Sequence, residues 1–300
     1  MNILVSGASG LVGAVLVPTL EAGGHKIRRL VRRAPGGTEV RWDPEAGGVD
    51  AAGIEGCEAV VHLAGENIAA GRWTAAKKQR IRDSRVKGTQ ALARALAGMP
   101  HPPKVLVCAS AIGYYGDRGA DLMREDSARG QGFLAEVCAD WEAAALPAAQ
   151  KGIRVVHLRF GVVLSRAGGA LAKMLLPFRL GVGGIIGSGR QYMSWLHIHD
   201  AVGVIQHALT ADRLRGPVNA VSPNPVTNLE FTRALGRVLL RPTLLPMPAF
   251  AARLAFGEMA DELLLSSTRV EPVRLQAVNY PFLHPWLDDA LRQLLGHKPG

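Results

Sequence analysis

The chain opens with Ile3-Leu4-Val5-Ser6-Gly7-Ala8-Ser9-Gly10-Leu11-Val12-Gly13, a short apolar run that breaks into a glycine turn. An amphipathic stretch follows and extends to about Leu20. A buried strand that ends in a glycine turn and opens a helix is the geometry that binds a diphosphate. Gly7 permits the tight turn, Gly10 lets backbone N–H groups approach the phosphate, and Gly13 lets the helix pack on the strand. The stretch therefore predicts a dinucleotide site that includes Gly7, Ser9, Gly10, Leu11, Val12 and Gly13.

Strand and helix signals alternate from residue 1 to about residue 220. Short apolar runs predict strands at 3–6, 26–31, 59–63, 105–109 and 154–160. Longer stretches between them predict helices at 11–21, 74–96 and 134–149. This alternation is typical of the α/β class and predicts a Rossmann-type doubly wound parallel sheet. Such sheets bind ligands at the carboxyl ends of their strands, so Leu63, Ala64 and Gly65 join the predicted cofactor site.

The character of the sequence changes near residue 161. Glycine-rich loops at 181–184 and 187–189 separate a predicted helix at 171–178 from a predicted strand at 192–196, and prolines recur between 223 and 248. We therefore predict a dinucleotide-binding domain at residues 1–220, whose loops from about 161 form the substrate side. A small helical domain is predicted at residues 248–297.

The composition suits a soluble globular protein, with 48% hydrophobic residues in 300. No apolar run approaches the roughly 18 residues of a membrane span, and the N-terminal run lacks the basic leader of a signal peptide. Cys57, Cys108 and Cys138 are widely spaced and form no Cys-x-x-Cys pair, which argues against a disulfide framework and a structural zinc site. We expect a cytoplasmic protein with no membrane partner and no bound metal.

The net charge of +10 favours anionic ligands. The arginines are scattered, however, and no basic tail, aromatic stacking platform or helix-turn-helix pattern accompanies them. We therefore expect no nucleic-acid partner.

The end of the second predicted strand indicates which nicotinamide cofactor binds. An acidic residue there would bind a free ribose 2′-hydroxyl, whereas arginine accommodates a 2′-phosphate. The segment Arg28-Arg29-Leu30-Val31-Arg32-Arg33 contains no carboxylate. Arg32 offers a planar donor fork to a phosphate, so the sequence favours NADP(H); the alternative is a surface arginine without a ligand.

Several longer motifs resemble one protein family. They are Gly65-Glu66-Asn67-Ile68, Ser110-Ala111-Ile112-Gly113-Tyr114-Tyr115-Gly116, Gly187-Ser188-Gly189-Arg190-Gln191 and Ser194-Trp195-Leu196-His197-Ile198-His199-Asp200. In this order they resemble the extended short-chain dehydrogenase/reductases, the superfamily of nucleotide-sugar epimerases and dehydratases. The chain is similar to an atypical branch described as "epimerase family protein", whose members carry a small C-terminal domain of unknown function.

The resemblance implies further site residues. Arg85 would reach cofactor phosphate or ribose, with a solvated helix face as the alternative, and Val162 would lie against the nicotinamide amide. Arg190, Gln191 and Trp195 would line the substrate side, where an arginine indicates an anionic small molecule. Relatives dimerise through helices that correspond to 74–96 and 134–149, so a homodimer is expected.

The usual catalytic pair of this family is missing. Members carry Tyr-x-x-x-Lys on the helix after the fifth strand, where the tyrosine exchanges a proton with the substrate and the lysine lowers its pKa. The matching positions here are Leu134 and Cys138, and Ala111 stands at the Ser/Thr position. Ser110 and Tyr115 remain as candidate catalytic residues, although Tyr115 could instead be a wall beside the cofactor. Cys138 could be a nucleophile or a buried structural thiol.

His197 and His199 stand two residues apart on a predicted strand. They could form a general-base or metal pair, but no third ligand is spaced to join them. The alternative is that one of them hydrogen-bonds backbone while Asp200 caps the next helix.

Two functions follow from these observations. The first is an NADP(H)-binding oxidoreductase or epimerase-like enzyme. The second is a cofactor-binding sensor or partner-binding module without turnover, which the missing tyrosine and lysine favour.

Overall fold

An eight-stranded sheet forms the centre of the computed structural model, which describes residues 1–296. Its order is β12-β8-β6-β5-β1-β2-β3-β4, and every pair is parallel except β3 and β4. The chain steps from β1 outward to β2 and β3, then returns to β5 on the other side of β1. The strands are β1 (Asn2–Ser6), β2 (Lys26–Val31), β3 (Glu39–Asp43), β4 (Gly48–Val49), β5 (Ala59–His62), β6 (Val105–Ala111), β8 (Arg154–Phe160) and β12 (Gly216–Ala220).

The central strands are apolar because both of their faces are covered. In β1, Ile3 and Val5 belong to one hydrophobic cluster and Leu4 belongs to the other, in keeping with the two-residue period of a strand. The crevice between β1 and β5 lies where the chain direction of the sheet reverses. Sheets of this kind bind their ligands there, at the carboxyl ends of the strands.

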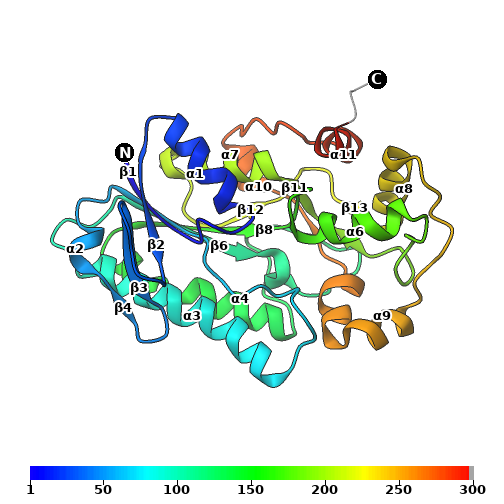
Figure 1. Cartoon of the computed structure of the whole chain (residues 1–300), viewed down its shortest axis with the longest axis horizontal. Helices are drawn as coiled ribbons and strands as arrows, with labels where there is room; N and C mark the ends of the chain where they lie inside the picture. The colour runs from blue at the N-terminus through cyan, green and yellow to red at the C-terminus, as the bar shows by residue number, and fades with distance from the viewer. Residues whose placement is uncertain (297–300) are drawn as a thin grey trace.

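Two layers of helices enclose the sheet (Figure 1). Helices α1 (Gly13–Ala22) and α7 (Ile198–Thr210) cover one face, and α3 (Ala75–Ala97) covers the other together with α4 (Phe133–Ala143). The shorter α2 (Ala51–Ile54) and α5 (Leu146–Gln150) complete the second layer. These layers confirm the predicted doubly wound fold.

The predicted elements differ from the observed ones in two respects. A single helix was predicted at 134–149, but α4 and α5 are separate because Pro147 has no N–H to donate to the preceding turn. The segments that form β3, β4, β12 and α8 (Asn228–Leu239) were not identified as elements from the sequence, whereas a helix was expected next to Asp200 and α7 begins there, at Ile198.

Small elements extend from the sheet. They are η1 (Ile112–Tyr115), β7 (Leu122–Met123), β9 (Val162–Leu164), α6 (Gly169–Arg179), β10 (Tyr192–Met193), β11 (Trp195–His197) and β13 (Val226–Thr227). Of these, α6, β11 and β13 are labelled on the right-hand side of Figure 1. The last part of the chain forms α9 (Ala249–Phe256), the π-helical η2 (Ala260–Leu265), β14 (Arg269–Val270), α10 (Val273–Ala277) and α11 (Leu287–Leu295). Residue 297, the last of the predicted helical domain, lies outside the described residues. β14 pairs in parallel with β7, so this region packs directly on the dinucleotide-binding part.

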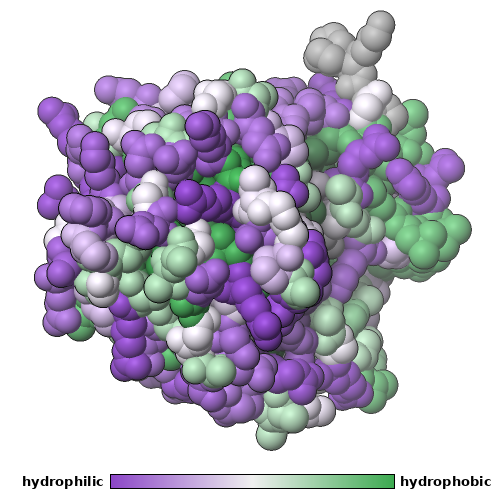
Figure 2. Space-filling model, turned by 60° about the vertical axis from the view of Figure 1, so that its left-hand side comes forward, coloured by the Kyte–Doolittle hydropathy of each residue, from purple (hydrophilic) through white to green (hydrophobic). Residues whose placement is uncertain are grey.

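The surface is polar over most of the face in Figure 2, and hydrophobic side chains gather at its right-hand margin. The most exposed large hydrophobic side chains occur around α6 and between α8 and α9; they include Leu176, Leu180, Leu240, Leu244, Phe250 and Leu254. Within residues 1–296, none of the helices combines the length and apolarity needed to cross a membrane.

Candidate functional site

A cleft of about 620 Å³ opens at the carboxyl ends of β1, β2 and β5. It brings together most of the residues predicted to bind the cofactor. The predicted residues that line it are Gly7, Ser9, Gly10, Arg32, Leu63, Ala64 and Gly65. Ser84, which the sequence placed beside Arg85 on the long helix, also lines this cleft.

The glycines of the turn are required by close backbone contacts. Gly7 has a φ of +69°, and a Cβ there would lie 2.7 Å from the carbonyl carbon of Leu63. A Cβ on Gly13 would lie 2.2 Å from the carbonyl oxygen of Gly7, which explains how α1 packs so closely on the turn. Gly10 donates its N–H to that same oxygen (2.9 Å) and is exposed to the cleft.

The start of α1 fits a phosphate group. No side chain caps its first turn, and that turn contains no acidic residue. The N–H groups and the positive end of the helix dipole are therefore left for an anion in the cleft. Val12 is the N-cap residue, and Leu11 packs against the backbone of Gly168 and Gly169 rather than lining the cleft.

The structure distinguishes between the four arginines near the end of β2. Arg28 donates to two backbone carbonyls, Arg29 pairs with a glutamate of α1, and Arg33 pairs with Glu39. Arg32 is exposed in the cleft and forms no ion pair within residues 1–296. Its guanidinium is therefore available in the cleft for the predicted contact with a 2′-phosphate.

A buried hydrogen-bonded chain supports the floor of this cleft. Ser6 Oγ lies 2.6 Å from His62 Nδ1, and His62 Nε2 lies 3.0 Å from Thr89 Oγ1, which also accepts from Trp141 Nε1. Burial lowers the pKa of His62 to about 4, so the imidazole is neutral. Sequence reasoning missed this chain because its members come from β1, β5, α3 and α4.

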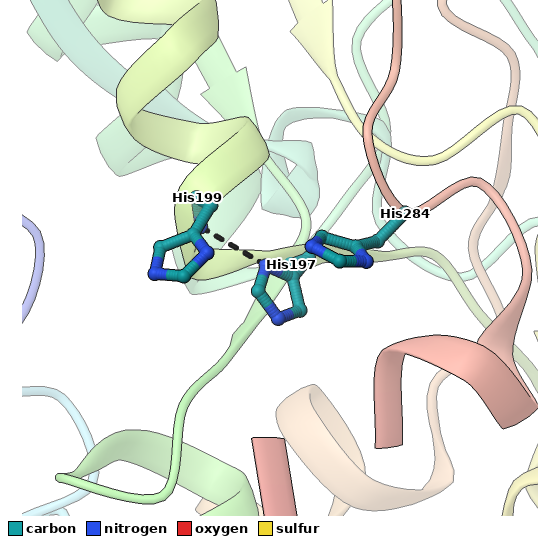
Figure 3. A group of neighbouring side chains, drawn as sticks. All are labelled: His197, His199 and His284. Atoms are coloured by element: carbon teal, nitrogen blue, oxygen red, sulfur yellow. Dashed lines mark hydrogen bonds between the residues drawn. The ribbon is translucent and has the colours of Figure 1, made fainter. Parts of the chain in front are cut away.

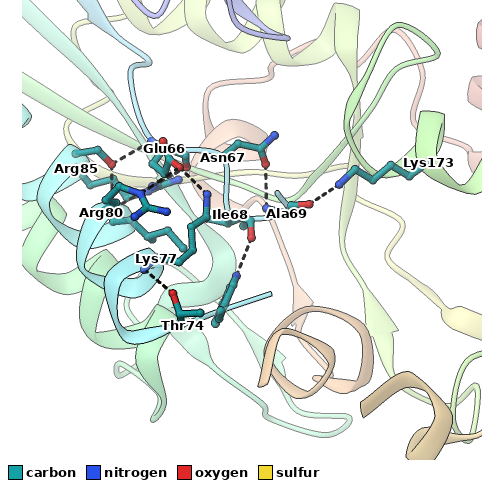
Figure 4. A network of polar contacts seen from close by, with 12 residues as sticks. Glu66, Asn67, Ile68, Ala69, Thr74, Lys77, Arg80, Arg85 and Lys173 are labelled. Carbon is teal, nitrogen blue, oxygen red and sulfur yellow. Dashed lines mark hydrogen bonds and ion pairs between the residues drawn. The ribbon is translucent and has the colours of Figure 1, made fainter. Parts of the chain in front are cut away.

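The loop after β5 is held by ionic and backbone contacts (Figure 4). Glu66 accepts from Lys77 Nζ (2.6 Å), and this bond together with Arg80 lowers the pKa of the Glu66 carboxyl. Lys173 of α6 donates to the carbonyl of Ala69. The loop therefore connects the dinucleotide cleft to the predicted substrate side.

Arg85 lies behind this loop and does not line the dinucleotide cleft. Its guanidinium donates to the carbonyl oxygens of Glu66 (3.0 Å) and Ile81 (3.2 Å) and lies 5.0 Å from the Trp141 ring. A Cβ on Gly65 would lie 3.3 Å from that guanidinium. These contacts give Arg85 a role in supporting Gly65, and its Nη1 group is engaged by backbone oxygens rather than by a cofactor.

A second cavity of about 400 Å³ lies at the end of β6. Val162 and Gln191 line it, as predicted for the nicotinamide and substrate sides. Arg190 is exposed outside it, and Trp195 is fully buried with its indole N–H donated to Asn224. The arginine expected to bind an anionic substrate is thus not in the cavity.

The end of the chain supplies one wall of the second cavity. Residues 261–266 line it, and Glu262 accepts from the backbone N–H groups of Phe133 and Leu134 (3.2 and 3.3 Å). This carboxylate caps α4, the helix that carries Tyr-x-x-x-Lys in related proteins. The sequence did not indicate this contact because its partners are about 130 residues apart.

The two candidate catalytic residues are held within the protein. Ser110 donates to Glu142 (2.7 Å), and Tyr115 is fully buried and donates to Asn219 (2.7 Å) while accepting from Arg159 (2.9 Å). Burial raises the pKa of Tyr115 to about 12. These contacts weigh against proton transfer by either residue, and neither lines the second cavity.

Cys138 also lacks the features of a nucleophile. It is buried, and burial raises the pKa of its thiol to about 12, as it does for Cys108. We expect all three cysteines of the native protein to resist alkylation at pH 8, because burial raises the pKa of each thiol, and to react quickly after unfolding in urea. Mass mapping of iodoacetamide adducts checks this expectation, and rapid native labelling at Cys138 would restore the nucleophile hypothesis.

His197 and His199 lie outside both cavities. His197 is the N-cap of α7, and its Nδ1 accepts from the backbone N–H of His199 (3.1 Å). This contact agrees with the alternative in which one of the two histidines hydrogen-bonds the backbone. Asp200 is not the cap. Its carboxylate instead accepts from the backbone N–H groups of Leu283 and His284.

Comparison with known proteins agrees with this arrangement. The model of the NAD dependent epimerase/dehydratase family matches residues 3–220, and a domain of unknown function, DUF1731, matches residues 247–294. An epimerase family protein of Mycobacterium bovis is 46% identical over 290 residues, which are 96% of each chain. The human epimerase family protein SDR39U1 is 40% identical over 299 residues, which cover 98% of this chain and 100% of the human one.

The fold is also similar to that of a solved relative. The crystal structure of human SDR39U1 (isoform 2) with NADPH superposes with a TM-score of 0.92 and 38% identity, over 99% of this chain and 100% of the human one. The similarity therefore includes both the sheet and the C-terminal region.

Proposed function

Because the chain belongs to the NAD dependent epimerase/dehydratase family, we propose that it is an NADP(H)-dependent oxidoreductase or epimerase-like enzyme. The observation that carries this proposal is the second cavity, which opens at the same edge of the sheet as the dinucleotide cleft. Val162 marks the expected place of the nicotinamide in this cavity, and residues 261–266 line it as a candidate wall for a substrate. The relative solved with NADPH supports the choice of cofactor.

Different residues of the first cleft would bind different groups of the cofactor. The N-terminus of α1 and the turn at Gly10 would hold the diphosphate, and Arg32 would hold the 2′-phosphate. Val162 lies in the second cavity, where the resemblance places the nicotinamide amide. The bound cofactor supplies hydride transfer, while the protein orients the substrate beside it.

A proton donor other than the usual tyrosine is required for carbonyl reduction. The second cavity presents Tyr192, whose hydroxyl can exchange a proton with a bound substrate. Its lining also contains the carboxylates of Asp117 and Asp261. The one arginine among the described residues of the lining is Arg253, and its guanidinium already forms an ion pair with Asp261. We therefore propose a polar small-molecule substrate without net negative charge, in place of the anionic one predicted from Arg190.

Replacing Arg32 by aspartate is expected to reverse the cofactor preference. The guanidinium would no longer bind the 2′-phosphate, and the new carboxylate would repel it but accept from a free 2′-hydroxyl. Fluorescence titrations should show NADPH binding weakened by about 100-fold or more, since one bidentate charge-assisted contact is replaced by repulsion. NADH binding should be unchanged or improved.

Arg29→Gln is the matched control, because Arg29 lines the same cleft but is paired with a glutamate. An Arg32→Asp protein that still preferred NADPH would show that another arginine binds the phosphate.

The rival function is an NADPH sensor without turnover, and the internal hydrogen bonds of Ser110 and Tyr115 favour it. The two are distinguished by incubating the protein with NADPH deuterated at C4 and a panel of aldehydes, ketones and nucleotide keto-sugars, whose carbonyl carbon accepts the hydride. Transfer of the label to a substrate, detected by mass spectrometry and reduced in Tyr192→Phe, supports the enzyme. Tight NADPH binding with no transfer across the panel supports the sensor.

Two further proposals concern the setting of the protein. Free cysteines in the described chain are consistent with the cytoplasm, where thiols stay reduced.

We also propose a homodimer through α3 and α4, whose shared surface carries the Arg82–Asp140 ion pair. Light scattering after size exclusion gives the mass in solution and checks the dimer.

A further inference from the structure

Three histidines from distant parts of the sequence meet near the start of α7 (Figure 3). His197 ends β11, His199 lies in the first turn of α7, and His284 lies between α10 and α11. One imidazole nitrogen from each residue lies within 4.8 Å of the other two. The spacing of His197 and His199 suggested a pair without a third ligand, and the fold supplies that ligand from residue 284.

The third histidine is positioned by buried hydrogen bonds. The carboxylate of Asp200 accepts from the backbone N–H groups of Leu283 (2.7 Å) and His284 (2.9 Å). Tyr280 donates its hydroxyl to the carbonyl of Asp200 (3.2 Å). Asp200 is fully buried, so the segment before α11 is held against α7 and the His284 ring is presented beside His197.

The hydrogen bonds of His197 define which of its nitrogens can bind an ion. Nδ1 accepts from the backbone N–H of His199, so Nδ1 carries the lone pair of the neutral ring. Nε2 therefore carries the proton and donates to Gln293 Oε1 (2.9 Å). Histidine ligands commonly donate their second nitrogen to such an oxygen, which fixes the orientation of the ring.

We propose that His197 Nδ1, His199 and His284 bind a divalent transition-metal ion that favours imidazole ligands, with Zn²⁺ as the representative ion. Three histidines with one open position match a common coordination of Zn²⁺. A tetrahedral Zn²⁺ with ligands at about 2.0–2.1 Å separates them by about 3.4 Å. The exposed side chain of His199 can rotate to close the present spacing.

The ion would connect two parts of the molecule. His197 and His199 belong to the segment that matches the epimerase family model, whereas His284 belongs to the DUF1731 match. Binding replaces the single hydrogen bond from His199 N–H to His197 Nδ1 with three metal–ligand bonds. An ion bound only to the folded chain stabilises it and holds the C-terminal region on α7.

Calorimetric titration of the chelator-treated full chain with Zn²⁺ tests the site, using protein without a histidine tag. One ion per chain is expected, and His199→Ala and His284→Ala should each weaken binding at least about tenfold, since even changes behind a ligand cost that much. His101→Ala removes an exposed histidine away from the cluster and should leave the affinity unchanged. Equal affinity in all four proteins, or no binding by the unmodified chain, would overturn the proposal.

Two more measurements test the coordination and its effect. Co²⁺ in the same site should give the strong visible absorption of a tetrahedral complex, and a weak octahedral spectrum would contradict the assigned ligand set. Zn²⁺ should raise the Tm of the unmodified chain and raise that of His284→Ala by less. A Tm that rises equally in both proteins would show that the ion does not bind through His284.

Discussion

Replacing Gly10 by aspartate is expected to abolish measurable NADPH binding while leaving the fold intact. Gly10 faces the cleft with an ordinary negative φ, and a Cβ there meets only the carbonyl oxygen of Gly7, at 3.2 Å. The new carboxylate would lie at the uncapped first turn of α1 and accept from the N–H groups left for the diphosphate. Two unit charges about 4 Å apart repel by about 4 kcal/mol near a protein surface, which corresponds to roughly 1000-fold in Kd.

Two control variants separate charge from volume. Gly10→Asn has nearly the same size but no charge, so it should weaken NADPH binding by less than Gly10→Asp, and Gly10→Ala should weaken it least. All three should retain the far-ultraviolet circular dichroism of the unmodified protein. Comparable NADPH affinity in Gly10→Asp and the unmodified chain would mean that the diphosphate binds elsewhere.

The Arg159→Met variant should lose a large part of its stability. Arg159 makes two 2.8 Å bonds to Glu142, and the two side chains are only 3% and 12% exposed. It also donates to Tyr115, and its guanidinium carbon lies 3.5 Å from the centre of the Tyr114 ring. Removing one partner leaves a buried carboxylate without its counter-charge, which costs about 3–5 kcal/mol. For a domain of this size the Tm should fall by roughly 6–20 °C.

Two further variants test whether the loss of stability comes from the unpaired buried charge. The double variant Glu142→Gln/Arg159→Met removes both charges and should recover a large part of the loss, since the glutamine oxygen still accepts from Ser110. Arg237→Met breaks an exposed pair with Asp288 and should change the unfolding free energy by less than about 1 kcal/mol. A similar loss in Arg237→Met and Arg159→Met would refute the special role of the buried pair.

The sequence predicted the parts of the fold that have local causes. The strands at 26–31 and 154–160 were predicted with their observed bounds, because apolar runs between turn residues define them. The glycine turn was equally well predicted, because a Cβ on any of its three glycines would lie close to the backbone of residues 7, 8 or 63–64. The cleft residues at the glycine turn and at the end of β2 follow from these two signals.

The remaining parts depend on contacts between distant residues. Tyr115 follows a strand that carries the site, yet its hydroxyl is bound by Asn219, 104 residues later in the chain. Nothing near Tyr115 in the sequence indicates that partner. Likewise, the capping of α4 by Glu262 and the approach of His284 to His197 arise from the way the C-terminal region folds back.

The second cavity and the dinucleotide cleft are completed at different times during synthesis on the ribosome. Residues 261–266 form one wall of the second cavity, and β14 pairs with β7, so this cavity depends on the last part of the chain. A nascent chain that has emerged as far as β8 already contains the strands that flank the dinucleotide cleft. The substrate cavity cannot close until about 110 further residues have emerged, which takes about 5–20 s at ordinary rates of synthesis. Capture of the dinucleotide can therefore precede completion of the substrate cavity, and a chain truncated before residue 261 is expected to lack one wall of that cavity.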